Sequence, residues 1–333
     1  MSEPRFLVVR LGSLGDIVHT FPAVATLRNS FPRAPIVWLT HPRWVDLVAC
    51  ADLASEIWPV DSRDLANVRA ILTRIRAHSF DMAIDYQGLW KSSLLPFLGR
   101  VPRRVGFSSA TVRELGVPIL YTDRVKAKTL HIADQNTELS LRAGATNPVE
   151  RVPLRVKDED RLRVCADLKS AGIESYIVLS PGGGWRSKCW PAERFGALCQ
   201  KIRRHLNLRC VINYGPGEES LANAVKSLSG DAQPAIYDGK LGQLMALLQG
   251  AQCIVGGDTG PLHLAIALGA KAVAIFGPTN PARNGPYPPQ PIVLRDPGAS
   301  TTHDRDEQTS PSLLKISVDQ VFDAVRERLG AST

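Results

Sequence analysis

The residues best suited to chemistry near the amino end are an aspartate and the glycine-containing turn before it. An apolar run at 6–10 leads into L-G-S-L-G-D at 11–16 and then into an apolar helical pattern. The dipole at a helix start stabilises a carboxylate such as Asp16, which would repel a phosphate but accept a proton from an attacking hydroxyl. This position therefore favours a general base, and a helix-capping aspartate is the alternative that the local sequence leaves open.

A second stretch, V-G-G-D-T-G-P-L-H-L-A-I-A-L-G at 255–269, has the residue types of an anion site. Asp258 or Thr259 can cap the helix that follows, and the backbone N–H groups of Thr259 and Gly260 are then available to a diphosphate. His263 lies in the first turn and can donate a hydrogen bond to phosphate. An ordinary capped helix with a core histidine is the alternative.

Two further loops follow predicted strands in the second half of the chain. In S-P-G-G-G-W-R-S-K at 180–188, Lys188 is suited to neutralise a phosphate or a leaving diphosphate. In N-Y-G-P-G-E-E-S at 213–220, Glu218 can accept hydrogen bonds from ribose hydroxyls, or it can serve as an ordinary acid at a helix start. A solvated turn is the alternative for the lysine loop.

Two nucleotide-binding patterns are missing from these glycine turns. The first turn does not match G-x-G-x-x-G, and the second predicted strand ends in Thr40 and His41 rather than in an acid. Both departures disfavour a dinucleotide-dependent oxidoreductase. The glycines at 182–184 do not have the spacing G-x-x-x-x-G-K-[ST], so a P-loop nucleotidase is also disfavoured.

The composition favours a globular protein with anionic partners. The 333 residues include 40 Lys and Arg against 32 Asp and Glu, a net charge of +8. Basic residues are dispersed and aromatic residues make up only 6%, so nucleic acid is the weakest of three candidate partners, behind a phosphorylated small molecule and an anionic lipid surface. The chain lacks a long apolar span and a signal-peptide pattern, and its six cysteines are scattered, so we expect a cytoplasmic protein without bound metal.

Short apolar runs alternate with helical patterns in both halves, which predicts βαβ units and two doubly wound parallel sheets. The join is expected near 147–175, with a charged helix at 158–171, and an amphipathic helix is expected at 317–329. The predicted strands lie at 6–10, 35–40, 81–86, 104–107, 176–181, 209–215, 252–258 and 272–278.

Taken together, these motifs resemble glycosyltransferase family 9, the ADP-heptose:lipopolysaccharide heptosyltransferases, and are most similar to its heptosyltransferase I branch. The resemblance runs along almost the whole chain. Its motifs are V-R-L-G-S-L-G-D-I-V-H-T, D-Y-Q-G-L-W-K-S, H-x-x-x-x-N at 131–136, W-x-x-K-x-W-P, G-P-G-E-E and D-T-G-P-L-H-L-A followed by F-G-P-T.

The resemblance implies a GT-B fold, in which two Rossmann-like domains face a central cleft. It implies an N-terminal acceptor-binding domain at 1–155, a C-terminal donor-binding domain at 156–315, and a helix at 316–333 that crosses back to pack on the N-terminal domain. The implied protein is a monomer at the cytoplasmic face of the inner membrane, in peripheral contact with it.

The implied reaction is an inverting transfer that uses neither metal nor cofactor. A hydroxyl on a Kdo sugar of a Kdo2-lipid A-type acceptor attacks the anomeric carbon of ADP-L-glycero-D-manno-heptose, and ADP leaves. Asp16 resembles the family's general base. The implied acceptor-binding residues are Ser13, Gly15, Gln87, Lys91, Arg113 and His131, and the implied donor-binding residues are Lys188, Glu218, Leu241, Asp258, Thr259, Gly260 and His263.

The resemblance leaves several alternatives open. The glycines at 182–184 stand where related enzymes often carry Thr-Thr-Arg, so the donor contacts around them are unassigned. Heptosyltransferase II, or another family 9 transferase with a different nucleotide sugar or acceptor, is the nearest alternative. More distant ones are a non-catalytic nucleotide-sugar-binding module and a nucleotide-sugar epimerase.

Overall fold

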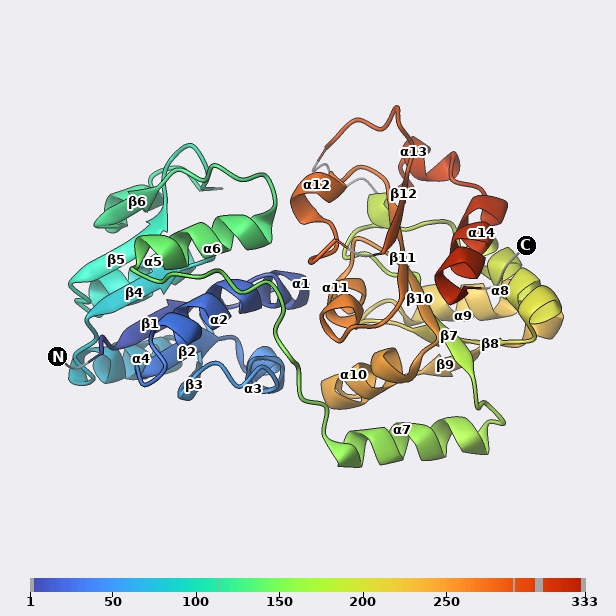
Figure 1. Ribbon diagram of the computed structural model, residues 1–333, viewed down its shortest axis with the longest axis horizontal. Helices are drawn as coiled ribbons and strands as arrows, with labels where there is room; N and C mark the ends of the chain where they lie inside the picture. The colour runs from blue at the N-terminus through green and yellow to red at the C-terminus, as the bar shows by residue number, and fades with distance from the viewer. Residues whose placement is uncertain (1–2, 113, 290, 303–307, 331–333) are drawn as a thin grey trace. The chain divides into compact units, whose positions relative to one another are not determined.

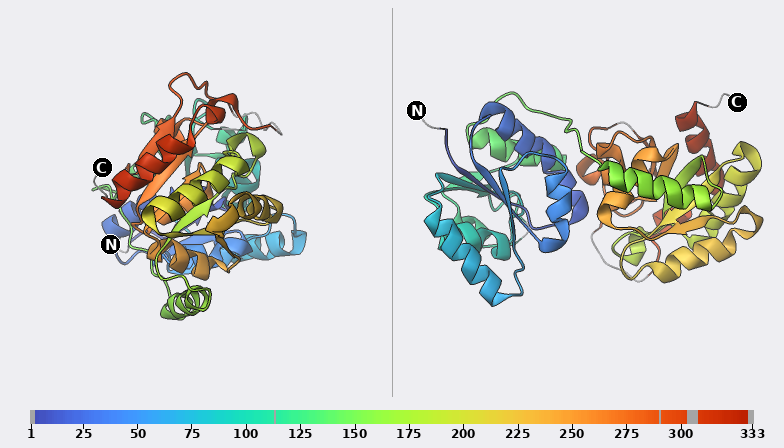
Figure 2. Two further views of the ribbon diagram at one scale, coloured as in Figure 1. Left: turned by 90° about the vertical axis from the view of Figure 1, so that its right-hand side faces the viewer. Right: turned by 90° about the horizontal axis from the view of Figure 1, so that it is seen from below.

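The computed structural model describes residues 3–112, 114–289, 291–302 and 308–330. The chain divides into two compact units, Met1–Arg155 and Val156–Thr333, called unit 1 and unit 2 below. Each unit has its own six-stranded parallel sheet with helices on both faces (Figures 1 and 2). None of the helices in the described part of the chain is long and apolar enough to cross a membrane.

The sheet of unit 1 has the strand order β3-β2-β1-β4-β5-β6. Its strand order reverses between β1 and β4, and the loops after these two strands therefore meet at the carboxyl edge, where open α/β sheets bind ligands. The strands are β1 (Phe6–Val9), β2 (Ile36–Thr40), β3 (Glu56–Pro59), β4 (Met82–Asp85), β5 (Arg103–Phe107) and β6 (Asp123–Val125).

Alternate side chains of the central strand β1 point to opposite faces of this sheet. Because helices cover both faces, the sequence of β1 is apolar throughout. Leu7 and Val9 belong to a core that includes Ile75 and Leu95, whereas the ring of Phe6 packs 5.2 Å from that of Phe31. The helices of unit 1 are α1 (Leu14–Val18), α2 (Phe21–Ser30), α3 (Val45–Ala49), α4 (Leu65–Ala77), α5 (Trp90–Leu98) and α6 (Ile132–Arg142), with 3-10 turns η1 (Pro42–Trp44) and η2 (Val117–Leu120).

Unit 2 repeats this topology, with the strand order β12-β11-β10-β7-β8-β9. Here the order reverses between β7 and β10, so the loops after these strands lie at the equivalent position. The strands are β7 (Tyr176–Ser180), β8 (Arg209–Asn213), β9 (Ala235–Tyr237), β10 (Cys253–Gly257), β11 (Ala272–Phe276) and β12 (Ile292–Arg295). The helices are α7 (Asp158–Ser170), α8 (Ala192–Leu206), α9 (Glu219–Leu228), α10 (Leu241–Gly250), α11 (Gly260–Ala267), α12 (Pro281–Asn284), α13 (Pro311–Leu314) and α14 (Val318–Leu329), with 3-10 turns η3 (Arg186–Lys188) and η4 (Gly230–Ala232).

The C-terminal helix α14 belongs to the core of unit 2. Its apolar side chains Val321, Phe322 and Val325 are buried in one cluster with residues of α8, β10 and β11. Figure 1 shows α14 beside the sheet of unit 2. The amphipathic pattern correctly predicted a helix, and its apolar face covers the sheet of unit 2. The expectation that residues 316–333 also pack back on the N-terminal domain stays a prediction.

Candidate active site

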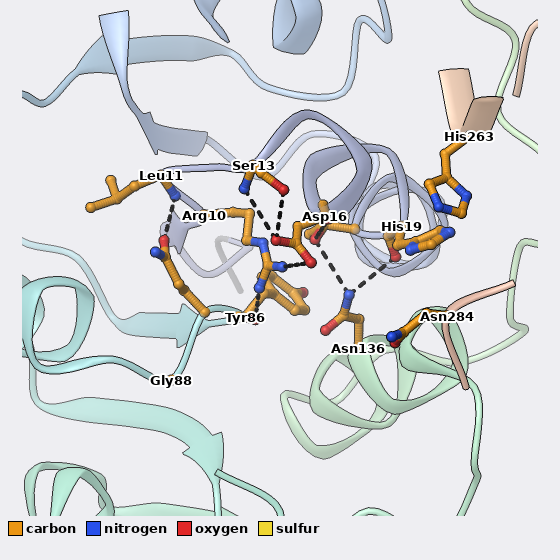
Figure 3. Close-up of polar contacts among 12 residues, drawn as sticks. Arg10, Leu11, Ser13, Asp16, His19, Tyr86, Gly88, Asn136, His263 and Asn284 are labelled. Atoms are coloured by element: carbon orange, nitrogen blue, oxygen red, sulfur yellow. Dashed lines mark hydrogen bonds and ion pairs between the residues drawn. The ribbon is translucent and has the colours of Figure 1, made fainter. Parts of the chain in front are cut away.

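Asp16 lies in the first turn of α1, directly after the loop that follows β1. Its Oδ2 accepts hydrogen bonds from the backbone N–H of Ser13 at 3.2 Å and from the Ser13 hydroxyl at 3.0 Å (Figure 3). Asp16 therefore does help to cap the helix, as the alternative interpretation held. Because its side chain is 41% exposed, the carboxylate also remains accessible to a ligand.

A buried arginine holds the other carboxylate oxygen of this aspartate. Arg10 Nη2 lies 2.7 Å from Asp16 Oδ1, and the arginine side chain is only 6% exposed (Figure 3). The guanidinium also donates to the backbone carbonyl of Tyr86, at the end of β4. A fixed cation at this distance favours the ionised carboxylate, which is the form that can accept a proton. Arg10 was not among the residues predicted from the sequence, although a charged residue at the end of an apolar strand is a usable signal.

The loop after β4 is tied to the loop after β1 through Gln87. The side-chain oxygen of Gln87 accepts a hydrogen bond from the backbone N–H of Leu11 at 2.7 Å. Asp85 in turn fixes the loop after β4. Its buried carboxylate accepts hydrogen bonds from the backbone N–H groups of Gln87 and Gly88. It also accepts from the Ser92 hydroxyl at 2.9 Å and from the Tyr121 hydroxyl at 2.7 Å. Burial raises the pKa of Asp85, and these hydrogen bonds offset part of the rise.

The other predicted acceptor residues lie at different places in unit 1. Gly15 is buried within α1, and Lys91 is exposed on α5. His131 caps α6, where its Nδ1 accepts from a backbone N–H and its ring lies 5.4 Å from that of His19. Arg113 lies outside the described residues. Ser13 and Gly15 are thus chain neighbours of Asp16, and the structure brings Gln87 to the same loop.

In unit 2 the loops after β7 and β10 are joined by a buried polar cluster of three residues. Lys188 Nζ lies 2.5 Å from Asp258 Oδ2 and donates to the backbone carbonyl of the same residue at 3.2 Å. His263 Nε2 lies 3.0 Å from Asp258 Oδ1. Burial by itself raises the pKa of Asp258, but the hydrogen bond to His263 and the charge of Lys188 outweigh it and hold that pKa well below its ordinary value.

The start of α11 lies beside this cluster. Thr259 is the N-cap, and its hydroxyl accepts from the N–H of Leu262 at 3.4 Å. Helix geometry leaves the N–H groups of the first turn, including that of Gly260, without an intrahelical acceptor. A cation, a histidine and a helix N-terminus therefore occupy one edge of the sheet, a combination that suits a phosphate.

Glu218 connects two glycine turns of unit 2. Its Oε1 accepts from the N–H of Gly183 at 3.1 Å, and its Oε2 accepts from the N–H of Gly215 at 2.9 Å. A Cβ on Gly182 would lie 2.0 Å from the same carboxylate, so a larger residue there would displace the Glu218 side chain. Gly182 and Gly183 thus lie against an acid. Leu241 lies apart from this contact, as the first residue of α10.

Two Rossmann-type sheets in one chain, each with its polar cluster at the point where the strand order reverses, define the GT-B class of glycosyltransferase fold. The chain belongs to glycosyltransferase family 9 (heptosyltransferase), whose family model matches residues 68–314. The protein is accordingly an enzyme that transfers a sugar.

Individual relatives agree with this assignment. Lipopolysaccharide heptosyltransferase 1 of Pseudomonas aeruginosa is 27% identical over 297 residues, which cover 85% of this chain and 81% of the relative. A family 9 glycosyltransferase from Veillonella parvula superposes with a TM-score of 0.86 at 23% identity, with 100% of this chain and 99% of the other covered. E. coli heptosyltransferase WaaC with ADP gives a TM-score of 0.77 at 24% identity, with 97% and 99% covered.

Proposed function

We propose that this enzyme is an inverting, metal-independent heptosyltransferase. It moves L-glycero-D-manno-heptose from ADP-heptose to a Kdo sugar of the lipopolysaccharide inner core, at the cytoplasmic face of the inner membrane. The observation that carries the proposal is the half-exposed Asp16 carboxylate, held by the buried Arg10 at 2.7 Å. Further support comes from the relatives, which include lipopolysaccharide heptosyltransferases and a heptosyltransferase with ADP.

The reaction needs one base and a site for the leaving group. A Kdo hydroxyl attacks the anomeric carbon of the donor while Asp16 takes its proton, and the bond from that carbon to the β-phosphate oxygen breaks with both electrons leaving on ADP. Attack on the face opposite the leaving group inverts the anomeric configuration. In the proposal, Ser13, Gly15, Gln87, Lys91, Arg113 and His131 bind the acceptor.

The donor is assigned to the loops of unit 2. Lys188, His263 and the first turn of α11 at Thr259 and Gly260 would stabilise the negative charge that develops on ADP. Glu218 would accept hydrogen bonds from the ribose hydroxyls through the carboxylate lone pairs that are not used by the N–H groups of Gly183 and Gly215. Leu241 is also assigned to the donor site. Asp258 would contact the heptose hydroxyls while it holds Lys188 and His263 in place.

Incubation with ADP-heptose and Kdo2-lipid A, followed by mass analysis of the lipid, tests this proposal. We expect the lipid to gain the mass of one heptose and ADP to be released in equal amount. If the lipid gains no mass while the enzyme binds ADP-heptose, the proposed acceptor is wrong. In a second assay the acceptor already carries one heptose. Selective extension of that acceptor would instead indicate a heptosyltransferase II.

Arg10 gives a prediction on pH dependence. Without the cation 2.7 Å from it, Asp16 should take up a proton more readily, so Arg10→Met is expected to move the acidic limb of the kcat/KM profile to higher pH. Arg10→Lys keeps the charge and should reverse most of this shift. An equal loss of activity at every pH in the Met variant would instead mean that Arg10 only supports the fold.

A further inference from the structure

Unit 1 carries a group of large apolar side chains on its surface, here called the apolar stripe. It consists of Trp90, Phe97 and Leu98 on α5, of Leu115 in the turn just before η2 and of Ile119 within η2. Their exposed fractions are 41%, 42% and 43% on the helix and 81% and 72% at the turn. Single exposed apolar residues are ordinary, but a contiguous group of them on a soluble domain marks an interaction surface.

The two parts of the apolar stripe lie side by side. A Cβ on Gly116 would lie 3.0 Å from the indole ring of Trp90, and the backbone N–H of Trp90 donates to the Glu114 carboxylate at 2.7 Å. The opposite face of α5 is already committed to the core of unit 1, through the buried Ser92 and Leu95. The core therefore does not account for the outward apolar face of this helix.

Basic residues predominate around the apolar stripe. Residues 86–114 contain five Lys and Arg residues and one acid, Glu114, whose carboxylate accepts the backbone N–H of Trp90. Within this segment Lys91 and Arg100 are exposed, and the guanidinium of Arg104 lies over the ring of Phe97, 5.4 Å from its centroid. Arg104 also donates to the backbone carbonyl of Leu120, at the end of η2, so a cation is fixed between the two parts of the stripe.

We propose that the apolar stripe docks unit 1 on an anionic lipid bilayer. An aromatic and aliphatic surface with a basic rim is the composition that partitions into the interface of such a membrane. A second copy of the chain is a poorer occupant, because a symmetric contact would bring the same cations together. The inference rests on the proposed function, in which the acceptor is a membrane glycolipid.

Vesicle sedimentation tests the docking directly. The full-length enzyme is mixed with phosphatidylcholine vesicles that contain, or lack, phosphatidylglycerol. We expect binding to the anionic vesicles, weakened by salt, and we expect Leu115→Ser and Ile119→Ser each to weaken it by about tenfold. Matched controls are Leu65→Ser and Leu162→Ser, because these leucines are equally exposed, at 72% and 71%, but lie on α4 and α7. The controls should bind like the wild type.

Three results would overturn the docking proposal. The first is equal vesicle binding by the wild type and by the Leu115→Ser/Ile119→Ser double variant. The second is equal binding of the wild type to vesicles with and without phosphatidylglycerol. The third is a change in the oligomeric state of the double variant when no vesicles are present. A soluble acidic partner that binds wild type alone, in the absence of vesicle binding, would also count against it. Thermal unfolding of the double variant checks that the fold is intact.

An activity assay separates this proposal from the proposed function. The double variant should transfer heptose normally to a deacylated, water-soluble acceptor and should lose at least tenfold in kcat/KM on the same acceptor embedded in anionic vesicles. If transfer to both acceptors falls equally, the stripe acts in catalysis and the docking proposal is wrong. If no acceptor is extended but vesicle binding still depends on the stripe, the proposed function fails and the docking stands.

Discussion

Replacement of Asp16 by asparagine is expected to lower kcat by about a thousandfold, the typical contribution of a general base. Asparagine has the same shape and can still accept the hydrogen bonds of Ser13, but it cannot take a proton from the acceptor hydroxyl. ADP binding should stay within about twofold of wild type, since the phosphate-binding loops are assigned to unit 2. Steady-state transfer kinetics and calorimetric titration with ADP measure the two quantities.

Asp46→Asn is the matched control for this substitution. Asp46 is likewise an acid in the first turn of a short helix of unit 1, and it is exposed. Its replacement should leave kcat unchanged. Turnover above about a tenth of the wild-type rate in Asp16→Asn would exclude Asp16 as the base. A non-catalytic nucleotide-sugar-binding module predicts an intact cellular role in this variant, and an epimerase predicts that the donor is converted without any acceptor.

The sequence predicted the central strands of both sheets but none of the edge strands. All eight predicted strands are present, and the four that were not predicted, β3, β6, β9 and β12, are the outer strands of the two sheets. Strands buried on both faces read as continuous apolar runs, whereas these four are half-exposed and carry charged or mixed residues. A periodicity argument therefore finds the centre of a parallel sheet and misses its margins.

The candidate site shows the same division between local and long-range information. Residue type and position after a strand made Asp16 and Asp258 candidates, because both lie within a few residues of the glycines that shape their loops. The contacts that hold these acids include distant segments: Lys188 is 70 residues from Asp258, and Arg10, although close to Asp16 in the chain, is held by the carbonyl of Tyr86, 76 residues away from it. Pairing across neighbouring strands depends on the strand order, which the local sequence does not contain.

Replacement of Asp258 by asparagine is expected to lower the free energy of unfolding of unit 2 by about 3–5 kcal/mol at neutral pH. The substitution leaves the Lys188 ammonium without its counter-ion at a place where its side chain is only 11% exposed, and it weakens the contact with His263. Native-state hydrogen exchange at β10 and α11 measures the change locally, which a multi-domain unfolding curve does not. Donor binding should fall as well, because Lys188 and His263 lose the residue that positions them.

The control for this prediction is the exposed ion pair of Lys201 with Asp319, whose side chains are 37% and 72% exposed. Asp319→Asn should cost less than about 1 kcal/mol, because water already solvates both groups. The pH dependence adds a second check. Since the pKa of Asp258 is lower in the folded chain than in the unfolded one, its stabilisation is complete above about pH 4 and is lost as the pH falls further. The difference between wild type and Asp258→Asn should therefore shrink below that pH, and a difference that grew on acidification would contradict the ionised cluster.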